Sequence, residues 1–364
     1  MKKTLLFLSA LSLLLVTSCG VDGPESTETV PSDKVVYVLN EGGYGQNNAS
    51  LSQVDLETGA VTNDLFSKVN GEPLGDTAND IIVTGDRIIM AVNGSNLIQF
   101  CNPECRAVAA VEVPNCRKMA TDGKYLYVTS YAGDGTVYKI DLSTYKVVST
   151  AKVGYEPEGI AIYGGKLYVA NSGGYAYLGT HGYEDTISIV DAASMETVKT
   201  VECGMFNLYG AFLQNSKYPQ YILVNAAGDY MSNPAGSFIF DCESEKVAAT
   251  YDFPATYAAQ YEGTFFALGS SFSYATYTNE YTTNRIEMRT DAAGATSPSL
   301  ESWVIRGIED MVSPYGIYIT NNGNLFVGDA GDYSSRGSIY RYDVEGKQLS
   351  RETVGVCPGH FASR

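Results

Sequence analysis

Residues with the chemistry of common catalytic sites are scarce in this chain. It has two histidines, His181 and His360, and seven cysteines. No Gly-x-Ser-x-Gly elbow, His-Glu-x-x-His pair or Walker loop occurs, and no Gly-x-Gly-x-x-Gly motif opens a helix. Cys357 and His360 are close enough in sequence to form a nucleophile pair, but no neighbouring residue would lower the pKa of the thiol. We therefore predict a protein that is not an enzyme and holds neither a metal nor a cofactor.

Tyrosine is the abundant residue that indicates binding. The chain has 28 Tyr and 37 Gly but a single Trp, Trp303. Many tyrosines stand in Gly- and Asn-rich segments typical of loops, where folding does not require an aromatic ring. Part of these rings should pack within loops or between sheets, and the rest should offer a rigid contact area with a hydroxyl at small entropic cost. The predicted ligand contacts are Tyr44, Tyr131, Tyr155, Tyr175, Tyr177, Tyr209, Tyr230, Tyr274, Tyr315 and His360.

Regularly spaced aspartates are the other feature that suggests chemistry. Each closes an alternating strand-like segment and is followed by a polar turn. An Asp in this place accepts hydrogen bonds from main-chain N–H groups two residues further on. We therefore interpret them as turn caps rather than as metal ligands or catalytic acids. They are Asp55, Asp141, Asp191, Asp241 and Asp343.

A pattern of strand-like segments recurs along the chain and predicts the fold. Its clearest copy has an apolar strand over 166–171, an alternating strand over 186–191 and a β-branched run over 197–201. Alternation over four to six residues predicts half-buried strands, and no window has a helical period. Units of about 47 residues match four-stranded blades, so we predict an all-β, seven-bladed β-propeller. The copies begin at or near Val35, Arg87, Tyr125, Lys166, Tyr221, Thr264 and Asn324.

The two ends of the repeat predict how the ring closes. In later copies a strand such as Pro157–Ile162 or Pro314–Ile319 precedes the apolar segment, whereas the first copy begins directly at Val35. The segment Pro358–Ala362 is left over at the C-terminus. We expect it to complete the first blade, so that no sheet edge stays open.

The N-terminal residues predict export and lipid attachment. Lys2 and Lys3 precede the apolar run Leu5–Val16, which is too short to span a membrane and typical of a signal peptide. The run ends in Val16-Thr-Ser-Cys19, which resembles a bacterial lipobox with Cys19 as the lipidated residue. We predict a signal peptide over residues 1–18, an acidic flexible tether over 19–34 and the propeller over 35–364.

Cysteine usage and net charge limit the disulfides and the classes of partner that the protein can have. In an oxidising envelope, Cys101 and Cys105 bracket a turn short enough for a disulfide, and geometry decides whether the bond forms. A formal net charge of −17 disfavours nucleic acid and anionic lipid and suits neutral or cationic ligands. The cysteines without a readable partner are Cys116, Cys203, Cys242 and Cys357.

Two resemblances follow from these residues. The segments 166–171, 187–191 and 157–162 resemble the YVTN-type repeat of surface-layer and YncE-like propellers, and this resemblance covers Val35 to the C-terminus. The lipoprotein start, the acidic tether and the opening 35–45 resemble outer-surface propeller lipoproteins of gut Bacteroidetes. Among these, the BtuG-type proteins capture corrinoids (cobalamin and cobinamide) and pass them to a TonB-dependent outer-membrane transporter. The resemblance implies the same function for this chain, at the outer membrane and facing the cell exterior.

Other functions stay open at this point. A glycan-binding or adhesive surface propeller is the first alternative, which the single Trp weakly disfavours although tyrosine platforms also bind sugars. A propeller lyase or quinoprotein-type enzyme would need acids, histidine or basic residues at the channel mouth, where Lys118, Glu156, Glu158 and His360 are the candidates. A structural surface-layer component without a small ligand is the third.

Overall fold

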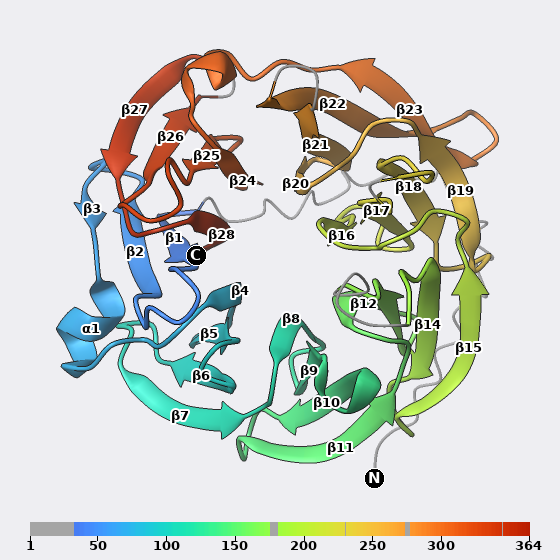
Figure 1. The fold of residues 1–364 in the computed structure, drawn as a ribbon, viewed down its shortest axis with the longest axis horizontal. Helices are drawn as coiled ribbons and strands as arrows, with labels where there is room; N and C mark the ends of the chain where they lie inside the picture. Colours follow the sequence, from blue (N-terminus) through green and yellow to red (C-terminus); the bar gives the residue numbers. More distant parts are fainter. Residues whose placement is uncertain (1–32, 175–180, 230, 274–276, 344) are drawn as a thin grey trace, which may run out of the picture. The chain divides into compact units, whose positions relative to one another are not determined.

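The computed structural model describes residues 33–174, 181–229, 231–273, 277–343 and 345–364. They form seven four-stranded antiparallel sheets, arranged as blades around a central axis (Figure 1). This confirms the predicted seven-bladed β-propeller. The predicted signal peptide and Cys19 lie outside the described residues, as does nearly all of the tether.

Each blade has one strand next to the axis and one at the rim, and the bounds below run from the axis outward. The first three blades are β28 (Pro358–Ser363), β1 (Val35–Asn40), β2 (Ser50–Asp55), β3 (Val61–Thr62); β4 (Ala78–Thr84), β5 (Arg87–Val92), β6 (Leu97–Cys101), β7 (Ala107–Glu112); and β8 (Cys116–Thr121), β9 (Tyr125–Ser130), β10 (Thr136–Asp141), β11 (Lys146–Lys152).

The other four blades follow the same order. They are β12 (Pro157–Tyr163), β13 (Lys166–Asn171), β14 (Thr186–Asp191), β15 (Glu196–Glu202); β16 (Phe212–Gln214), β17 (Tyr221–Ala226), β18 (Gly236–Asp241), β19 (Lys246–Tyr251); β20 (Tyr257–Tyr261), β21 (Thr264–Ser273), β22 (Thr278–Thr290), β23 (Thr296–Ser302); and β24 (Pro314–Ile319), β25 (Leu325–Asp329), β26 (Ser338–Tyr342), β27 (Gln348–Thr353).

The ring closes as the sequence predicts. Strand β28 pairs antiparallel with β1, with His360 opposite Leu39 and Phe361 opposite Val38. The main chains of Val35 and Arg364 bond each other at 3.0 Å and 2.9 Å, so the last residue sits beside the first strand. The seven innermost strands also contact one another in sequence round the axis. The first blade therefore has no open inner edge.

The second strand of each blade is more buried than alternation predicts. Strands β1, β5, β9 and β13 have five wholly buried residues out of six, because each blade is packed between two others. The expectation of half-buried strands is wrong for these strands. It fits the outer strands better, such as β19, where exposed and half-buried positions alternate. Tyrosines of the second strands are buried between neighbouring blades, with Tyr37, Tyr127 and Tyr168 each 1% exposed.

The aspartates at the ends of the third strands cap turns, as interpreted from the sequence. Asp55 Oδ1 accepts the N–H groups of Glu57 at 3.0 Å and Thr58 at 2.7 Å. Asp141 Oδ1 accepts those of Ser143 at 2.8 Å and Thr144 at 3.1 Å. Asp191 accepts the same pair from Ala193 and Ser194, whereas Asp241 accepts the N–H of Glu243, and Asp343 accepts those of Glu345 and Lys347. Asp291 caps the equivalent turn of the sixth blade.

Short helices interrupt the repeat in a few places. The described helices are α1 (Leu65–Asn70) and the 3-10 turns η1 (Ala132–Asp134) and η3 (Ile308–Asp310). Helix α1 takes the place of most of the fourth strand of the first blade, since β3 has only two residues. In the part of the chain that the structure describes, no helix has the length and apolar character needed to cross a membrane.

Candidate functional site

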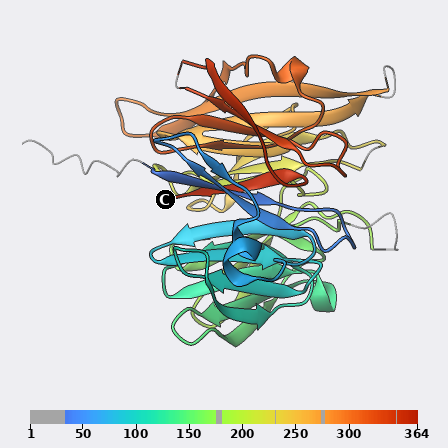
Figure 2. The same cartoon turned by 90° about the vertical axis from the view of Figure 1, so that its left-hand side faces the viewer.

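The two ends of the propeller differ in the segments they carry. Antiparallel strands place the segments after each second strand and before each innermost strand on one side, which we call the loop side. The remaining connections, most of them short turns, lie on the opposite turn side. Strand β1 starts on the turn side, beside the C-terminus (Figure 2). The first described residue, Asp33, is held there by Asn321, whose main-chain N–H it accepts at 2.6 Å.

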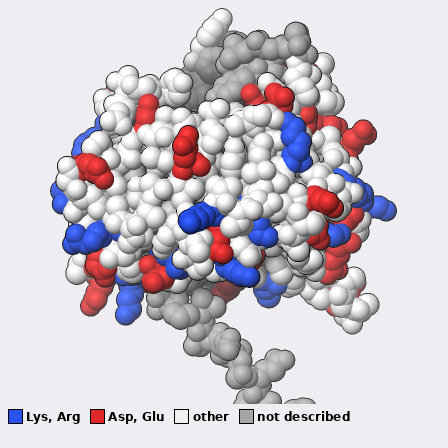
Figure 3. All heavy atoms as spheres, turned by 90° about the horizontal axis from the view of Figure 1, so that it is seen from below, with Lys and Arg blue, Asp and Glu red and all other residues white. Residues whose placement is uncertain are grey.

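The two sides differ in their exposed apolar and charged side chains. In Figure 3, where the loop side is uppermost, most of the charged side chains in view lie toward the turn side. The large apolar residues exposed on the outer strands are Val108, Val147, Val148, Val198, Leu300 and Leu349. All the others found among the described residues lie on the loop side: Tyr44, Tyr209, Met231, Tyr277, Val304, Val312 and Tyr333. The loop side therefore exposes apolar surface of the kind that marks interaction sites.

A pocket of about 350 Å³ opens on the loop side, and we call it the mouth pocket. It is lined by Tyr44, Asn93, Asn115, Arg117 and Tyr131. Tyr44 is 85% exposed, so its ring is free to pack on a ligand. The pocket thus combines two aromatic rings, two amides and a guanidinium.

A second cavity, the channel cavity, measures about 340 Å³ and lies on the propeller axis. All seven innermost strands or the residues just before them contribute to its wall. Arg117 lines both spaces and so lies between the mouth pocket and the channel cavity. The polar side chains of the wall are Glu41, Asn79, Asp80, Arg117, Lys118, Glu158, Tyr209, Thr256, Tyr257, Tyr315 and His360.

β-bulges explain why these polar side chains meet. The pairing of an innermost strand with its neighbour shifts between Ala78 and Asp80, between Cys116 and Met119, and between Pro314 and Gly316. A bulge leaves an extra residue unpaired and turns its side chain to a new direction. The strands β12 and β28 have the same irregularity. The residues within these bulges include Asn79, Arg117, Lys118, Glu158 and Tyr315.

An ion pair between Arg117 and Glu158 forms the centre of the site. Arg117 Nη2 lies 2.9 Å from Glu158 Oε1, and Nε donates to the same oxygen at 3.1 Å. Both side chains are buried. Burial is the largest single effect and would lower the pKa of Arg117, but the Glu158 carboxylate, together with Tyr131 and Tyr209, raises that pKa well above the ordinary value. Arg117 therefore stays charged, and the pair holds both groups in place.

Tyr131 completes this pair. Its hydroxyl donates to Glu158 Oε1, and the Arg117 guanidinium lies 5.0 Å from the centre of its ring. Burial and the nearby carboxylate raise the pKa of Tyr131 well above its ordinary value, so the phenol stays neutral. The hydrogen bond and the cation–π contact fix the orientation of a ring that lines the mouth pocket.

Glu41 is the second carboxylate of the channel cavity. Its Oε2 accepts the Tyr315 hydroxyl at 2.5 Å, and its Oε1 accepts the Asn79 amide at 3.2 Å. The Tyr315 ring lies 5.8 Å from the ring of Tyr257 and 5.7 Å from that of Tyr333. Glu41 thus stands at the edge of an aromatic cluster.

The predicted contacts fall in different places. Tyr44 and Tyr131 line the mouth pocket, whereas Tyr209, Tyr315 and His360 line the channel cavity. Tyr155 lines neither space. The predicted contacts Tyr175, Tyr177, Tyr230 and Tyr274 lie outside the described residues.

Tyr155 and the two histidines have distinct surroundings. The ring of Tyr155 stacks on that of His181 with 4.2 Å between centres, and His181 Nε2 lies 2.7 Å from Glu184 Oε1. Burial, then the charges of Lys118 and Arg117, holds the pKa of His360 well below its usual range. His360 is therefore neutral.

Sequence reasoning missed Glu41, Asn79, Arg117 and Tyr257. A signal existed for most of them. Aligning the innermost strands of the repeat places Asn79, Arg117, Glu158 and Tyr315 at equivalent positions, one residue after a small residue or proline. Polar or aromatic residues at a recurrent position next to an apolar strand indicate a common role facing the axis. Tyr257 begins its own innermost strand, β20.

The cysteines show no sign of catalysis. Burial raises the pKa of Cys357 to about 11, so its thiol is protonated at neutral pH and a poor nucleophile. Cys101 and Cys105 are buried free thiols, and hydrogen bonding between them raises the pKa of Cys101. The disulfide between them is not formed in the structure and stays a prediction for an oxidising compartment. Within the described ranges, no three His, Cys, Asp or Glu residues converge on a metal position.

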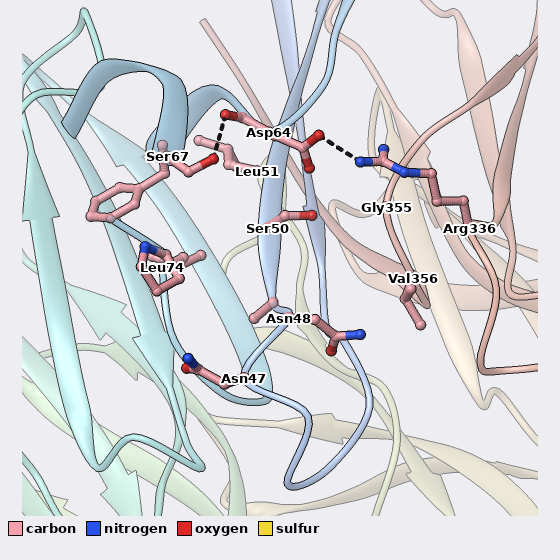
Figure 4. A pocket seen from close by; sticks show the side chains of 13 residues that line it. Asn47, Asn48, Ser50, Leu51, Asp64, Ser67, Leu74, Arg336, Gly355 and Val356 are labelled. Atoms are coloured by element: carbon pink, nitrogen blue, oxygen red, sulfur yellow. Dashed lines mark hydrogen bonds and ion pairs between the residues drawn. The ribbon is translucent and has the colours of Figure 1, made fainter. Parts of the chain in front are cut away.

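A third pocket, the rim pocket, lies away from the axis. It measures about 320 Å³ and lies between helix α1, the start of β2 and the seventh blade, where the fourth strand of the first blade, β3, has only two residues. Figure 4 shows Asp64 and Arg336 joined across one end, with 2.5 Å between Oδ2 and Nη2, and Asn47 and Asn48 toward the other end. Its inner wall includes buried Leu51, Phe66 and Leu74.

Comparison with known proteins supports the fold but does not identify a family. No protein-family model and no curated protein sequence matches the chain. Hydrazine synthase of Kuenenia stuttgartiensis superposes with a TM-score of 0.57 at 17% identity, covering 78% of this chain and 88% of that one.

Two further solved structures give the same result. A Quinonprotein alcohol dehydrogenase-like protein of Bacteroides thetaiotaomicron has a TM-score of 0.60 at 13% identity, covering 91% of this chain and 78% of that chain. The dihydro-heme d1 dehydrogenase NirN, in complex with DHE, has a TM-score of 0.52 at 12% identity, covering 93% and 78%. At these identities the similarity shows the fold alone.

Proposed function

We propose that the loop side captures a corrinoid, without catalysis, and that the protein is a lipid-anchored carrier that delivers it to a TonB-dependent outer-membrane transporter. The observation that carries this proposal is that the exposed tyrosines lie on the loop side, with Tyr44 at the mouth pocket, while most of the charged side chains in view in Figure 3 lie toward the turn side. Aromatic surface at the mouth of a rigid scaffold favours tight binding, since little entropy is lost.

The chemistry of the mouth suits this ligand. A corrin is a broad macrocycle fringed with amide groups, and it is too large for a space of about 350 Å³. It would therefore lie across the mouth, with ring edges on Tyr44 and amide side chains near Asn93 and Asn115. The net charge of −17 favours cationic cobinamide over an anion.

The position of the N-terminal side supports attachment at the membrane. Asp33 and the start of β1 lie on the turn side. A lipid on Cys19 would tether the propeller through that side and leave the loop side free for ligand and transporter. Export of the lipoprotein to the outer surface rests on the acidic tether of residues 19–34 and is part of the same proposal.

Titration calorimetry tests the proposal on a full-length Cys19→Ala protein, which cannot be lipidated. We expect one-to-one binding of cyanocobalamin or cobinamide. Tyr44→Ala should weaken it about tenfold or more, because an exposed aromatic contact is lost. Tyr163→Ala is the matched control, since Tyr163 lies on the turn side and bonds Glu243 at 2.6 Å. No heat from a folded sample, or equal losses in the two variants, would contradict the proposal.

One observation favours a second candidate, glycan binding. The rim pocket brings a carboxylate, a guanidinium and two amides to one place above an apolar wall, a set that suits neutral hydroxyl-rich ligands. In this case a disaccharide panel would give saturable binding that Asp64→Ala abolishes and Tyr44→Ala leaves unchanged. Corrinoid binding without saccharide binding would exclude it.

A further inference from the structure

The charges of the channel cavity are not balanced on its Glu41 side. Arg117 is paired with Glu158 at 2.9 Å. Lys118 Nζ donates to the Asn79 carbonyl at 2.6 Å. Burial raises the pKa of Asp80, and the Lys118 charge lowers it by a smaller amount. Glu41 forms no ion pair with any cation of the described chain and is held by two neutral groups only. A partly buried carboxylate without a cation favours a positively charged ligand.

The surroundings of Glu41 are aromatic. Tyr209, Tyr257 and Tyr315 line the cavity with it, and the Glu41 charge acts on all three phenols. Burial, more than that charge, raises their pKa values. The pKa of Tyr209 rises to about 12 although the nearby Arg117 guanidinium lowers it, so all three phenols stay neutral at physiological pH. Tyr333 packs edge-on against Tyr315 at 5.7 Å and closes the cluster on one side. The faces and hydroxyls of neutral phenols attract a cation.

We infer that the Glu41 side of the channel cavity binds a small organic cation, an alkylated ammonium, between the carboxylate and the rings of Tyr209, Tyr257 and Tyr315. The alkyl groups would contact the rings and the positive charge would face Glu41. This site is separate from the mouth pocket, with Arg117 and its partner Glu158 between them. The inference does not rest on the corrinoid proposal.

Other ligand classes fit less well. An anion would meet the Glu41 carboxylate, and a metal ion would need more ligands than the described residues bring together. A macrocycle exceeds the cavity of about 340 Å³, whereas a compact ammonium compound fits at the lower end of small-molecule pocket sizes.

Choline is the probe, and its uncharged analogue, in which carbon replaces nitrogen, is the matched control ligand. We expect choline to bind the full-length Cys19→Ala protein at least about tenfold more tightly than the analogue, measured by ligand-observed NMR titration. The two ligands share shape and apolar surface. Their difference therefore reports the charge alone, and equal affinities would overturn the inference.

Variants locate the site. Glu41→Gln keeps an acceptor for Tyr315 and should weaken choline about tenfold or more while leaving the analogue unchanged. Tyr257→Phe, which keeps the ring, should retain choline binding, whereas Tyr257→Leu should lose it. Glu57→Gln, an exposed turn-side change, is the control.

The outcomes separate this inference from the corrinoid proposal. Choline binding that survives in a folded Glu41→Gln protein, or no choline binding in the parent protein, would overturn the cation site. Circular dichroism and the melting temperature show whether each variant is folded. Corrinoid binding is measured separately, and its loss in Tyr44→Ala but not in Glu41→Gln would keep the two sites distinct.

Discussion

The turn side and the loop side of this propeller are built on opposite plans. On the turn side, the third strands of the first, third and fourth blades end in an Asp that accepts main-chain N–H groups two and three residues on, at distances between 2.7 Å and 3.1 Å. On the loop side the segments differ in length and sequence from blade to blade. Their side chains meet across the axis in a network that no single blade contains.

The difference shows where the fold is specified and where a binding function has room to vary. A turn that is capped within itself stabilises its own blade, whatever the other six contain. The Arg117–Glu158 pair joins the third and fourth blades, and the Glu41–Tyr315 bond joins the segment after β1 to the seventh blade, with partners 41 and 274 residues apart. The axial network of the loop side therefore depends on contacts between blades, whereas each turn cap forms within its own blade.

Breaking the buried ion pair should have the largest effect. Arg117→Met leaves the Glu158 carboxylate buried without its cation, and this should cost about 3–5 kcal/mol of unfolding free energy in urea denaturation. The double variant Arg117→Met/Glu158→Leu should recover much of that loss. Arg289→Met, at an exposed ion pair on an outer strand, should change little. If Arg117→Met and Arg289→Met reduced the free energy of unfolding equally, the buried network would stabilise the protein no more than a surface ion pair does.

Lowering the pH should reduce the free energy of unfolding of the protein through His360. Because the folded protein holds the pKa of His360 well below 6.5, only the unfolded chain takes up a proton just below that pH. The stabilisation is therefore full above about pH 6.5 and is lost as the pH falls, by up to about 1.4 kcal/mol per pH unit. His360→Gln should lack this part of the pH dependence in denaturation curves between pH 7 and 5, as no proton is then taken up.

His181 provides the control for this experiment. Its side chain is 46% exposed, so His181→Gln should keep the acid destabilisation of the parent protein. A His360→Gln protein that loses stability with falling pH as steeply as the parent would show that the channel histidine titrates freely.

Removing one turn cap should have the smallest and most local effect. Asp141→Ala leaves the main-chain N–H groups of Ser143 and Thr144 without their acceptor and should lower the melting temperature by about 2 °C. Ligand binding on the loop side should stay unchanged. A change in affinity for a loop-side ligand would show that the two sides are coupled and would break the comparison.

These turn caps also respond to acid. Hydrogen bonds from the Ser143 hydroxyl and main chain lower the pKa of Asp141, and similar bonds lower that of Asp191. Their contribution is therefore complete above the ordinary pKa of an aspartate and disappears as the pH falls through the lowered values.

Most of the fold could be predicted from the sequence, because its information is local and repeated. The apolar strand, the Asp-capped turn and the average unit length appear in every clear copy, and the spare segment over 358–362 predicts closure on β1. The degree of burial of the second strands could not be predicted in this way. Lys166–Asn171 has an ordinary strand pattern, and its burial on both faces comes from the neighbouring blades.

The candidate site could be predicted only in part. Tyr44 and Tyr131 stand in loops and line the mouth pocket, whereas Tyr155 packs against His181, and ligand contact by each of them stays a prediction. The sequence shows that Arg117 precedes an apolar segment. It does not show that a bulge turns the side chain toward Glu158 in the next blade.

The sequence by itself determined the number of blades, the turn caps and the closing strand, because each depends on a pattern within one repeat or on a count of repeats. The tertiary structure alone decided which polar side chains share the axis, which carboxylate lacks a cation, and where a shortened fourth strand leaves a pocket. The physical reason is distance. Hydrogen bonds within a turn join neighbours in sequence, whereas the charges of the channel meet only after the blades have packed side by side and water has been excluded from between them.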